Sequence, residues 1–303
     1  MKDAYTLADL RDWPAVAGAE SPPIRLSVFG DPVAHSRSPQ MHNPALQASG
    51  IDAAYTRLHI LPAELKEAIQ RLPSLGFVGT NITIPHKVAA MGWMHEVDPL
   101  ARRAGGVNTV LIRGTRLVGF TTDGPGLSRA IQDDFGVPLR DLRVMILGAG
   151  GGAGTAIAVQ CEIEKVPRLV LVNRTFPRAL TLAQRLRCPA EVVLWEEASL
   201  ARVLPDIDLI INATPLGMSA DPSLASISPI PDALLRPFHY IYDTVYTAGR
   251  TPLLIAAEAA GAISANGLSM LLHQGALSFE LWFARPAPLD VMRNALLATT
   301  ASP

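Results

Sequence analysis

Cysteine is scarce in this chain of 303 residues, where only Cys161 and Cys188 occur. Two cysteines cannot build a disulfide framework and their spacing is not that of a metal site, so we expect a reducing compartment, the cytoplasm. Long apolar runs are also missing, because none approaches the ~18 residues of a membrane-spanning helix. The first residues include Asp3, Asp9 and Asp12 and no apolar stretch, which argues against a secretory signal.

The chain also lacks an excess of charge of either sign, because 26 basic and 27 acidic residues give a formal net charge of -1. Proteins that bind nucleic acids or anionic membranes use strongly basic surfaces. We therefore expect a small-molecule substrate, no nucleic-acid or membrane partner, and a monomer or homodimer. With 303 residues the chain is long enough for two domains with substantial cores.

Glycine, by contrast, is concentrated in residues 147–154, whose sequence is LGAGGGAG. The apolar run 144–147 predicts a buried parallel strand before the glycines, and residues 155–159 predict the first turns of a helix after them. Glycines in this place let the backbone approach a pyrophosphate, whose charge then lies at the helix N-terminus. A flexible linker is the alternative, but linkers are not flanked by an apolar strand and helix. The pattern predicts dinucleotide binding.

The next predicted strand, residues 169–172, ends without the acidic residue that would bind the ribose 2′-hydroxyl of NAD. It ends in Asn173-Arg174-Thr175, with Arg178 one turn further on, and no acidic residue lies near it in the sequence. A guanidinium can hold a 2′-phosphate through two charge-assisted hydrogen bonds. The sequence therefore predicts NADP(H) as the cofactor. Arginines that only solvate a helix face are the alternative, which fits the later arginines of this region better than Arg174.

Alternating strands and helices predict an α/β fold with two domains. We expect an N-terminal extension (1–24), a substrate-binding α/β domain (25–123 together with 265–303) and a Rossmann-type, doubly wound NADP-binding domain (124–264). A helical pattern from Gly267 to about Ala284 should return the chain to the first domain. Ligands of open α/β sheets bind at the carboxyl ends of the strands, so we expect the site there. In the first domain we predict strands at 26–29, 54–58 and 77–81, and helices at 39–49, at 62–72 and from Pro85. We also predict a hairpin there, formed by residues 107–112 and 117–120. In the second domain we predict strands at 144–147, 169–172, 192–194, 209–211 and 240–242.

Polar side chains that could perform chemistry follow the predicted strands of the first domain. Ser36 and Ser38 precede a helix start, where two hydroxyls and unpaired backbone N–H groups could receive a carboxylate; a simple N-cap is the alternative. Lys87 falls in the first turn of a predicted helix, where the positive end of the helix dipole disfavours a cation. Proton transfer would explain that position, and a solvated surface charge is the alternative. Asp123 could orient this lysine, accept from a substrate hydroxyl, or form an Asx turn.

Eight short stretches, in order from about residue 26 to 283, resemble the signature stretches of the shikimate dehydrogenase family. They are GDPVAHSRSP (30–39), NITIPHK (81–87), GVNT (106–109), LGAGGG (147–152), NRT (173–175), NATPLGM (212–218), YDTVY (242–246) with TPLL (251–254), and GLSML (267–271) with Gln274. Each stretch alone is weakly specific, but eight in the same order make coincidence implausible. Residues 1–24 lie outside the resemblance.

The resemblance implies the reversible, NADP-linked reduction of 3-dehydroshikimate to shikimate in chorismate and aromatic amino-acid biosynthesis. Lys87, as an ammonium, would stabilise and protonate the developing alkoxide, and neutral Lys87 would take the proton in the reverse direction. Lys87 and Asp123 would form the catalytic pair. The substrate carboxylate would bind Ser36 and Ser38, with Tyr246 nearby, and the ring hydroxyls would bind Asn81, Thr83, Asn108, Asp123 and Gln274. The cofactor would bind Gly148, Ala149, Gly150, Gly151, Gly152, Asn173, Arg174, Thr175, Arg178, Thr214, Met218, Thr244 and Gly267, and no metal is expected.

Two other functions are open at this point. A quinate/shikimate dehydrogenase that uses NAD would be expected to carry an acidic residue at the strand end, where this chain has Asn173-Arg174-Thr175. A non-catalytic protein that senses NADP through the same fold would be expected to have lost Lys87 or Asp123, and both are present. Thr121 stands where the family usually has Asn, a departure that bears on the choice between shikimate and quinate.

Overall fold

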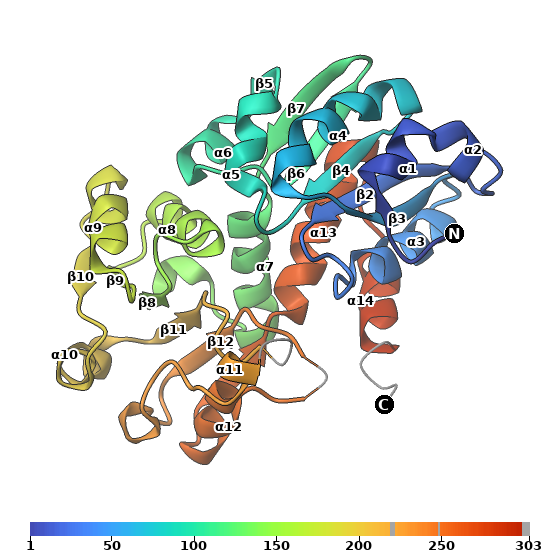
Figure 1. Cartoon of the computed structure of the whole chain (residues 1–303). Helices are drawn as coiled ribbons and strands as arrows, with labels where there is room; N and C mark the ends of the chain where they lie inside the picture. The colour runs from blue at the N-terminus through green and yellow to red at the C-terminus, as the bar shows by residue number, and fades with distance from the viewer. Residues whose placement is uncertain (219–221, 248, 299–303) are drawn as a thin grey trace. The chain divides into compact units, whose positions relative to one another are not determined.

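In the computed structural model the chain divides into two compact units (Figure 1). Unit 1 comprises Met1–Thr122 together with the residues from Leu272 onward, and unit 2 comprises Asp123–Leu271. The structure describes residues 1–218, 222–247 and 249–298, so the end of the predicted first domain, 299–303, lies outside the described residues. In this described part, no helix has both the length and the apolar character needed to cross a membrane.

Unit 1 is built on a mixed seven-stranded sheet with the order β1-β3-β2-β4-β6-β7-β5. β1, β2, β3 and β4 pair in parallel, β6 is antiparallel to both β4 and β7, and β5 is parallel to β7. The strands are β1 (Tyr5–Thr6), β2 (Ile24–Gly30), β3 (Ala54–His59), β4 (Gly79–Ile82), β5 (Glu96–Val97), β6 (Thr109–Arg113) and β7 (Arg116–Phe120). The helices are α1 (Leu7–Arg11), α2 (Trp13–Ala17), α3 (Ser38–Ala48), α4 (Leu65–Arg71), α5 (Lys87–Ala90), α6 (Pro99–Ala104), the later part of α13 (Leu268–Phe283) and α14 (Leu289–Ala298).

The register of this sheet brings four separate segments to one edge. Phe29 near the end of β2 pairs with Ile82 at the end of β4, so the residues that follow these parallel strands leave the sheet together. Because β6 runs the other way, its first residue, Thr109, pairs with both Asn81 and Phe120. The loops after β2 and β4, the start of β6 and the end of β7 therefore meet at this edge.

Residues 1–24, to which the sequence assigns no role, fold into unit 1. β1 pairs with β3, and Tyr5 and Leu10 are fully buried in the unit 1 core. Trp13 packs against Tyr5 and Phe77 with ring centroids 5.1 and 5.4 Å apart. At the start of α1, Thr6 and Asp9 form a capping box, which satisfies free backbone N–H groups at the helix end.

Unit 2 has a six-stranded parallel sheet with the order β10-β9-β8-β11-β12-β13, of which Figure 1 labels β8 to β12. This is the doubly wound Rossmann order, in which the chain reverses direction across the sheet between β8 and β11. The strands are β8 (Arg143–Leu147), β9 (Arg168–Val172), β10 (Glu191–Val193), β11 (Leu209–Asn212), β12 (Tyr240–Asp243) and β13 (Ile263–Asn266). The helices are α7 (Asp123–Phe135), α8 (Gly152–Glu164), α9 (Phe176–Arg185), α10 (Glu197–Val203), α11 (Pro222–Ala225), α12 (Pro252–Ala259) and the start of α13.

The continuous apolar runs of the unit 2 strands have a direct cause, because both faces of this sheet are buried. Ile146 and Leu171 belong to the core on one face, whereas their neighbours Met145 and Val170 belong to the core on the other. A strand buried on both faces has no polar alternation. The predicted parallel strands of unit 2 are thus confirmed, and β13 is an additional strand that the sequence analysis did not predict.

Several predicted boundaries in unit 1 move in the structure. The helix expected at 62–72 is α4 flanked by 3₁₀ turns, Pro62–Glu64 and Leu72–Leu75. The helix expected from Pro85 begins two residues later, because His86 N–H closes a turn onto the Thr83 carbonyl. The predicted hairpin is confirmed with a tighter loop, because Arg113 and Arg116 pair with each other as its last rung.

Candidate active site

Ser36 and Ser38 lie in the turn between β2 and α3, and both are buried. Ser36 Oγ donates to Ser38 Oγ over 3.2 Å, and Ser38 N–H lies 3.4 Å from Ser36 Oγ. Ser38 is also the first residue of α3, where the backbone N–H groups lack partners within the helix. Two hydroxyls held side by side at a helix start form a suitable receptor for a small carboxylate.

The Asn81 side chain, at the end of β4, is fully engaged by protein groups. Its Oδ1 accepts from the Tyr55 hydroxyl at 2.7 Å. Its Nδ2 lies 3.2 Å from the Asn108 carbonyl, 3.1 Å from Thr109 Oγ1 and 3.0 Å from Ser278 Oγ. Asn81 therefore connects β3, β4, β6 and α13 inside unit 1.

Asn108 lies beside Asn81, just before β6, and is 3% exposed. Its Oδ1 accepts from the backbone N–H of Thr122 at 2.8 Å, and its Nδ2 donates to Thr122 Oγ1 at 2.9 Å and to Gln274 Oε1 at 3.3 Å. Thr83 follows β4 and is anchored by its N–H to the Phe29 carbonyl at 2.8 Å. The structure thus brings Asn81, Asn108 and Gln274 into one network of amide side chains.

Lys87 is the first residue of α5 and is half-buried. Its carbonyl accepts from Val107 N–H at 2.9 Å, and a Cβ at Gly106 would lie 3.5 Å from Lys87 Cβ. The lysine is therefore held against the loop that carries Asn108. Because α5 has only four residues, it has little of the dipole on which the sequence argument for Lys87 relied. The position beside Asn108 is a better reason to consider Lys87 than the helix.

The two remaining candidates for substrate binding belong to unit 2. Asp123 is the first residue of α7 and is 5% exposed. Tyr246 is half-buried in the loop after β12.

The glycine-rich turn after β8 has the backbone that the sequence predicts. Gly148 and Gly150 have φ values of +87° and +93°, which side chains rarely adopt. A Cβ at Gly148 would lie 2.7 Å from Thr214 Cγ2, and one at Gly150 would lie 2.9 Å from the Arg178 carbonyl oxygen. A Cβ at Gly154 would lie 2.4 Å from the Gly148 carbonyl oxygen. Only glycine therefore lets β8, α8, α9 and the loop after β11 meet here.

The start of α8 and the basic loop after β9 lie beside this turn. Gly151 caps α8 without a side-chain hydrogen bond, so the N–H groups of the first turn can receive an anion. Asn173 Nδ2 donates to the Ala149 carbonyl at 2.6 Å, while its Oδ1 accepts from Thr175 N–H at 2.8 Å. Arg174 and Arg178 are exposed, and in the part of the chain that the structure describes neither forms an ion pair.

The loops after β11 and β12 are joined by a buried carboxylate, Asp243. It accepts from Asn212 Nδ2 at 2.9 Å, from Thr251 Oγ1 at 2.6 Å and from Val245 N–H at 3.1 Å. Burial raises the pKa of Asp243 above the ordinary value for an aspartate, while these hydrogen bonds act in the opposite direction. Asn212 Oδ1 in turn accepts from the Thr214 hydroxyl at 2.6 Å.

Three further cofactor candidates, Met218, Thr244 and Gly267, follow β11, β12 and β13 respectively. Thr244 N–H donates to the Asn212 carbonyl at 3.0 Å. A Cβ at Gly267 would lie 2.1 Å from the Thr244 carbonyl oxygen, so this position also requires glycine. Met218 is half-buried and is the last described residue before the gap at 219–221.

These features fit a bound NADP(H). The glycine turn offers backbone that a pyrophosphate can approach, and α8 offers N–H groups with a favourable dipole. The loop after β9 offers two cations that pair with no carboxylate among the residues that the structure describes. The loops after β8 and β11 meet at the point where the strand order reverses, which is where this fold binds nucleotides.

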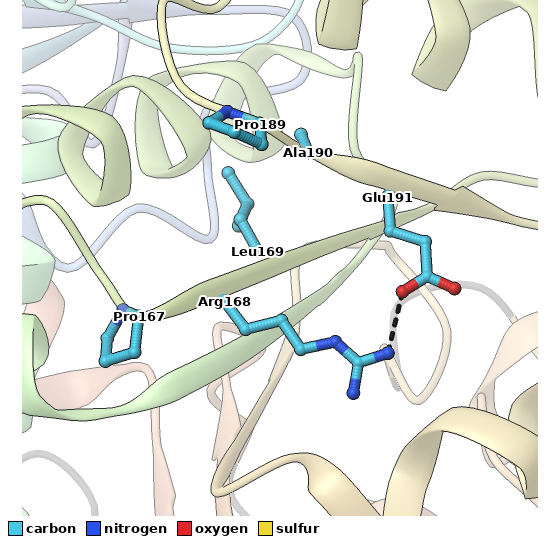
Figure 2. A pocket seen from close by; sticks show the side chains of 6 residues that line it. All are labelled: Pro167, Arg168, Leu169, Pro189, Ala190 and Glu191. Carbon is cyan, nitrogen blue, oxygen red and sulfur yellow. Dashed lines mark hydrogen bonds and ion pairs between the residues drawn. The ribbon is translucent and has the colours of Figure 1, made fainter.

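A pocket elsewhere in unit 2 is not part of this arrangement. Figure 2 shows it at the amino ends of β9 and β10, lined by Pro167, Arg168, Leu169, Pro189, Ala190 and Glu191. Arg168 and Glu191 form an ion pair of 2.7 Å, so these charges already satisfy each other. Since ligands of this fold bind at the carboxyl ends of the strands, we do not assign a function to this pocket.

Two residues with positioning roles were missed by the sequence analysis. Tyr55 is fully buried, and its hydroxyl is hydrogen-bonded to Asn81. Asp243 was quoted only as part of a family stretch. Asp243 is the one charged residue of β12, whereas Tyr55 stands in β3 among other polar residues and has no distinguishing signal. The partners of both residues lie in other segments and could not be read from the sequence.

Comparison with known proteins gives a consistent result over most of the chain. The shikimate dehydrogenase substrate binding domain matches residues 28–110, shikimate / quinate 5-dehydrogenase matches residues 129–219, and the shikimate 5′-dehydrogenase C-terminal domain matches residues 267–297. A shikimate dehydrogenase (NADP(+)) from Symbiobacterium thermophilum is 43% identical over 279 residues, which are 90% of this chain and 93% of that protein.

Two solved structures show that this fold alone does not determine the substrate or the cofactor. Shikimate 5-dehydrogenase from Thermus thermophilus, in complex with NADP(H) and shikimate, is 36% identical to this chain with a TM-score of 0.80. The match covers 91% of this chain and 99% of that protein's chain. Quinate dehydrogenase from Corynebacterium glutamicum, in complex with NAD, is 30% identical with the same TM-score of 0.80, and the coverage is again 91% and 99%. The choice of substrate and cofactor therefore depends on individual side chains.

Proposed function

Because the chain belongs to the shikimate dehydrogenase family, we propose that it catalyses the reversible reduction of 3-dehydroshikimate to shikimate with NADPH, in chorismate and aromatic amino-acid biosynthesis. The observation that supports this proposal most strongly is the grouping of polar side chains at one edge of the unit 1 sheet. There the serine pair, the amide network and Lys87 lie on loops that meet through the strand register. These groups match a small ring that has a carboxylate, several hydroxyls and a carbonyl to be protonated.

The substrate groups are assigned by their chemistry. Ser36 and Ser38, with Tyr246, hold the carboxylate, while Thr83, Asn108, Asp123 and Gln274 bind the ring hydroxyls. Asn81 was expected to bind a ring hydroxyl directly. Its amide is already engaged by Tyr55, Thr109 and Ser278, so we assign it to holding Asn108 in place.

The catalytic residues are Lys87 and Asp123. In reduction, Lys87 as an ammonium stabilises the developing alkoxide oxygen and gives it a proton; in oxidation, neutral Lys87 removes the proton from the hydroxyl. Asp123 accepts a hydrogen bond from a substrate hydroxyl and so holds the ring for this transfer. When bound, NADP(H) supplies or receives the hydride.

The cofactor is assigned to the glycine turn and the loops around it. Residues 148–152 hold the pyrophosphate, and Asn173, Arg174, Thr175 and Arg178 hold the adenosine ribose with its 2′-phosphate. Thr214, Met218, Thr244 and Gly267 lie toward the nicotinamide half. The two arginines favour NADP over NAD, because both guanidinium groups are exposed and neither forms an ion pair with a described residue, so each can bind a phosphate.

Location and assembly complete the proposal. A cytoplasmic location is supported by Cys161 and Cys188, which are not joined in a disulfide bond. We propose a monomer or a homodimer, which sedimentation equilibrium would distinguish. The division between unit 1 as the substrate domain and unit 2 as the NADP domain is supported by where the serine pair and the glycine turn lie.

Initial rates with shikimate or quinate, and with NADP or NAD, test this function. We expect the fastest turnover with shikimate and NADP, and Lys87→Ala should lose roughly 10²- to 10⁴-fold in kcat while still binding NADP in calorimetry. Lys66→Ala is a matched control, because Lys66 is exposed and stacks on Trp93 at 4.9 Å. Faster turnover with quinate or NAD would favour a quinate/shikimate dehydrogenase, and NADP binding without turnover would favour a sensor.

A further inference from the structure

Arg57 is a buried cation that the proposed mechanism does not use. It lies in β3, its side chain is 9% exposed, and it follows Tyr55 by two residues. Its Nε and Nη2 both donate to the carbonyl oxygen of Ser36, at 2.9 and 2.7 Å. Arg57 therefore holds the backbone of one of the two serines assigned to the substrate carboxylate.

The remaining guanidinium hydrogens are also engaged. Nη2 donates to Gln40 Oε1 at 3.0 Å, and Nη1 donates to the Asp3 carboxylate at 2.9 Å and lies 3.4 Å from the Asp3 carbonyl. A guanidinium has five N–H donors in a fixed plane, and these contacts occupy all five. Complete satisfaction explains how the charge is tolerated inside the unit, because an unpaired buried charge is costly.

The N-terminal segment places Asp3 at this arginine. β1 begins two residues after Asp3 and pairs with Leu58 and His59, the two residues that follow Arg57. Tyr5 and Leu10 anchor the segment in the unit 1 core. The contact between Asp3 and Arg57 is therefore fixed by a packed strand and helix.

The turn that carries Ser36 and Ser38, here called the serine turn, is held in shape by the contact between Arg57 and the Ser36 carbonyl. Ser36 N–H donates to the Val33 carbonyl at 3.0 Å, so the residue is held at its N–H by its own loop and at its carbonyl by Arg57. Rotation of either peptide plane would move Ser36 Oγ away from Ser38 Oγ. Of these two contacts, the one at the carbonyl comes from outside the loop.

We propose that Arg57, supported by Asp3 of the N-terminal segment, is a positioning residue for the substrate carboxylate. This rests on the proposed function, in which Ser36 and Ser38 bind that carboxylate. Arg57 acts through the Ser36 backbone and does not touch the substrate. Its loss should weaken the binding of a carboxylate-bearing substrate more than the binding of NADP or the chemical step.

The test compares Arg57→Lys and Asp3→Asn with the wild type. A lysine keeps the charge but cannot span Ser36, Gln40 and Asp3 together, so we expect KM for shikimate to rise about tenfold. KM for NADP should stay unchanged and kcat should stay within about twofold. Asp3→Asn should raise KM for shikimate about two- to threefold, because the Asp3 side chain is 78% exposed and an exposed ion pair is weak.

Arg11→Lys is the matched control. Arg11 also joins the N-terminal segment to the rest of unit 1, through two hydrogen bonds of 2.9 and 2.7 Å to Glu67, but it does not contact the serine turn. Neither KM should change in this variant. A rise in KM for shikimate equal to that of Arg57→Lys would overturn the proposal in favour of a general loss of structure.

Measurements with shikimate methyl ester distinguish a role of Arg57 in positioning the carboxylate site from a role in the stability of the fold. The ester lacks the negative carboxylate, so the ratio of kcat/KM between wild type and Arg57→Lys should be much smaller with the ester than with the acid. An equal ratio for both substrates, or an unchanged KM for shikimate, would overturn the proposal. If wild-type protein does not oxidise shikimate with NADP at all, the proposed function fails first, and this inference fails with it.

Discussion

The hydroxyl of Tyr55 donates a 2.7 Å hydrogen bond to Oδ1 of Asn81, and this bond sets which way the Asn81 amide faces. With Oδ1 turned toward Tyr55, Nδ2 points to the Asn108 carbonyl, Thr109 and Ser278. Burial raises the pKa of Tyr55 well above its ordinary value, so the phenol keeps its proton and remains a donor. The orientation of the amide network thus begins at a residue in β3.

Tyr55→Phe should disturb this network without removing a substrate ligand. Asn81 Oδ1 would lose a buried partner, which costs about 1–3 kcal/mol of unfolding free energy. We expect kcat/KM for shikimate to fall about tenfold and KM for NADP to stay unchanged, measured by initial rates. Tyr5→Phe is the control, since that buried hydroxyl reaches Glu20 at 3.3 Å; an equal fall in kcat/KM there would contradict the role of Tyr55.

Gly148→Ala should damage the cofactor site through the backbone. The φ of +87° strains any side chain, and the new Cβ would lie 2.7 Å from Thr214 Cγ2 and 2.9 Å from the Ala213 carbonyl. We expect a loss of about 1–3 kcal/mol in unfolding free energy by urea denaturation, and weaker NADP binding in calorimetry. Gly152→Ala is the control for stability, because nothing lies within 4 Å of its Cβ position. Equal stability of the two variants would refute the steric argument.

Arg174→Ala should reduce the preference for NADP over NAD. A hydrogen bond to a charged group contributes about 1.5–3 kcal/mol, and exposure lowers this, so KM for NADP should rise about tenfold while KM for NAD changes little. Arg140→Ala is the control: it is also exposed and in unit 2, but it lies just before the amino end of β8. If both variants leave the ratio of the two KM values unchanged, Arg174 does not select the cofactor.

His42→Phe should make the protein less sensitive to acid. His42 on α3 is fully buried, stacks on Tyr55 at 4.5 Å, and within the described residues neither ring nitrogen has a hydrogen-bond partner. Burial lowers the pKa of His42 from 6.5 to about 3. Between these values the unfolded chain takes up a proton that the folded chain does not. The contribution of His42 to the free energy of unfolding is therefore complete above pH 6.5 and is lost as pH falls toward 3.

Unfolding by urea at several pH values would measure this effect. From pH 7 to pH 4.5 the wild type should lose roughly 2–3 kcal/mol more than His42→Phe, at about 1.4 kcal/mol per pH unit below 6.5. The phenyl ring keeps the stacking, and no hydrogen bond is lost. His35→Phe, at an exposed position, should follow the wild type. Parallel pH curves for wild type and His42→Phe would show that this histidine is not the source of acid sensitivity.

The sequence by itself determined the parallel strands of unit 2 and the glycine turn between β8 and α8. These depend on local chemistry: an apolar run with no polar alternation must be buried on both faces, and a glycine cluster between strand and helix fits a backbone with positive φ. The choice of arginine at position 174 is likewise visible without a fold. The resemblance to the family stretches identified the candidate substrate- and cofactor-binding residues, because each stretch is continuous in sequence.

Only the tertiary structure decided which of these residues touch one another. The strands β1, β5 and β13 have weak sequence signals and form where a neighbouring strand offers a partner. The contacts of Asn81 with Ser278, and of Arg57 with Asp3 and Ser36, join segments far apart in the chain. A hydrogen bond between distant segments depends on strand order and register, which local periodicity does not encode. For this reason the ligands could be named from the sequence, while the residues that hold them in place appeared only in the fold.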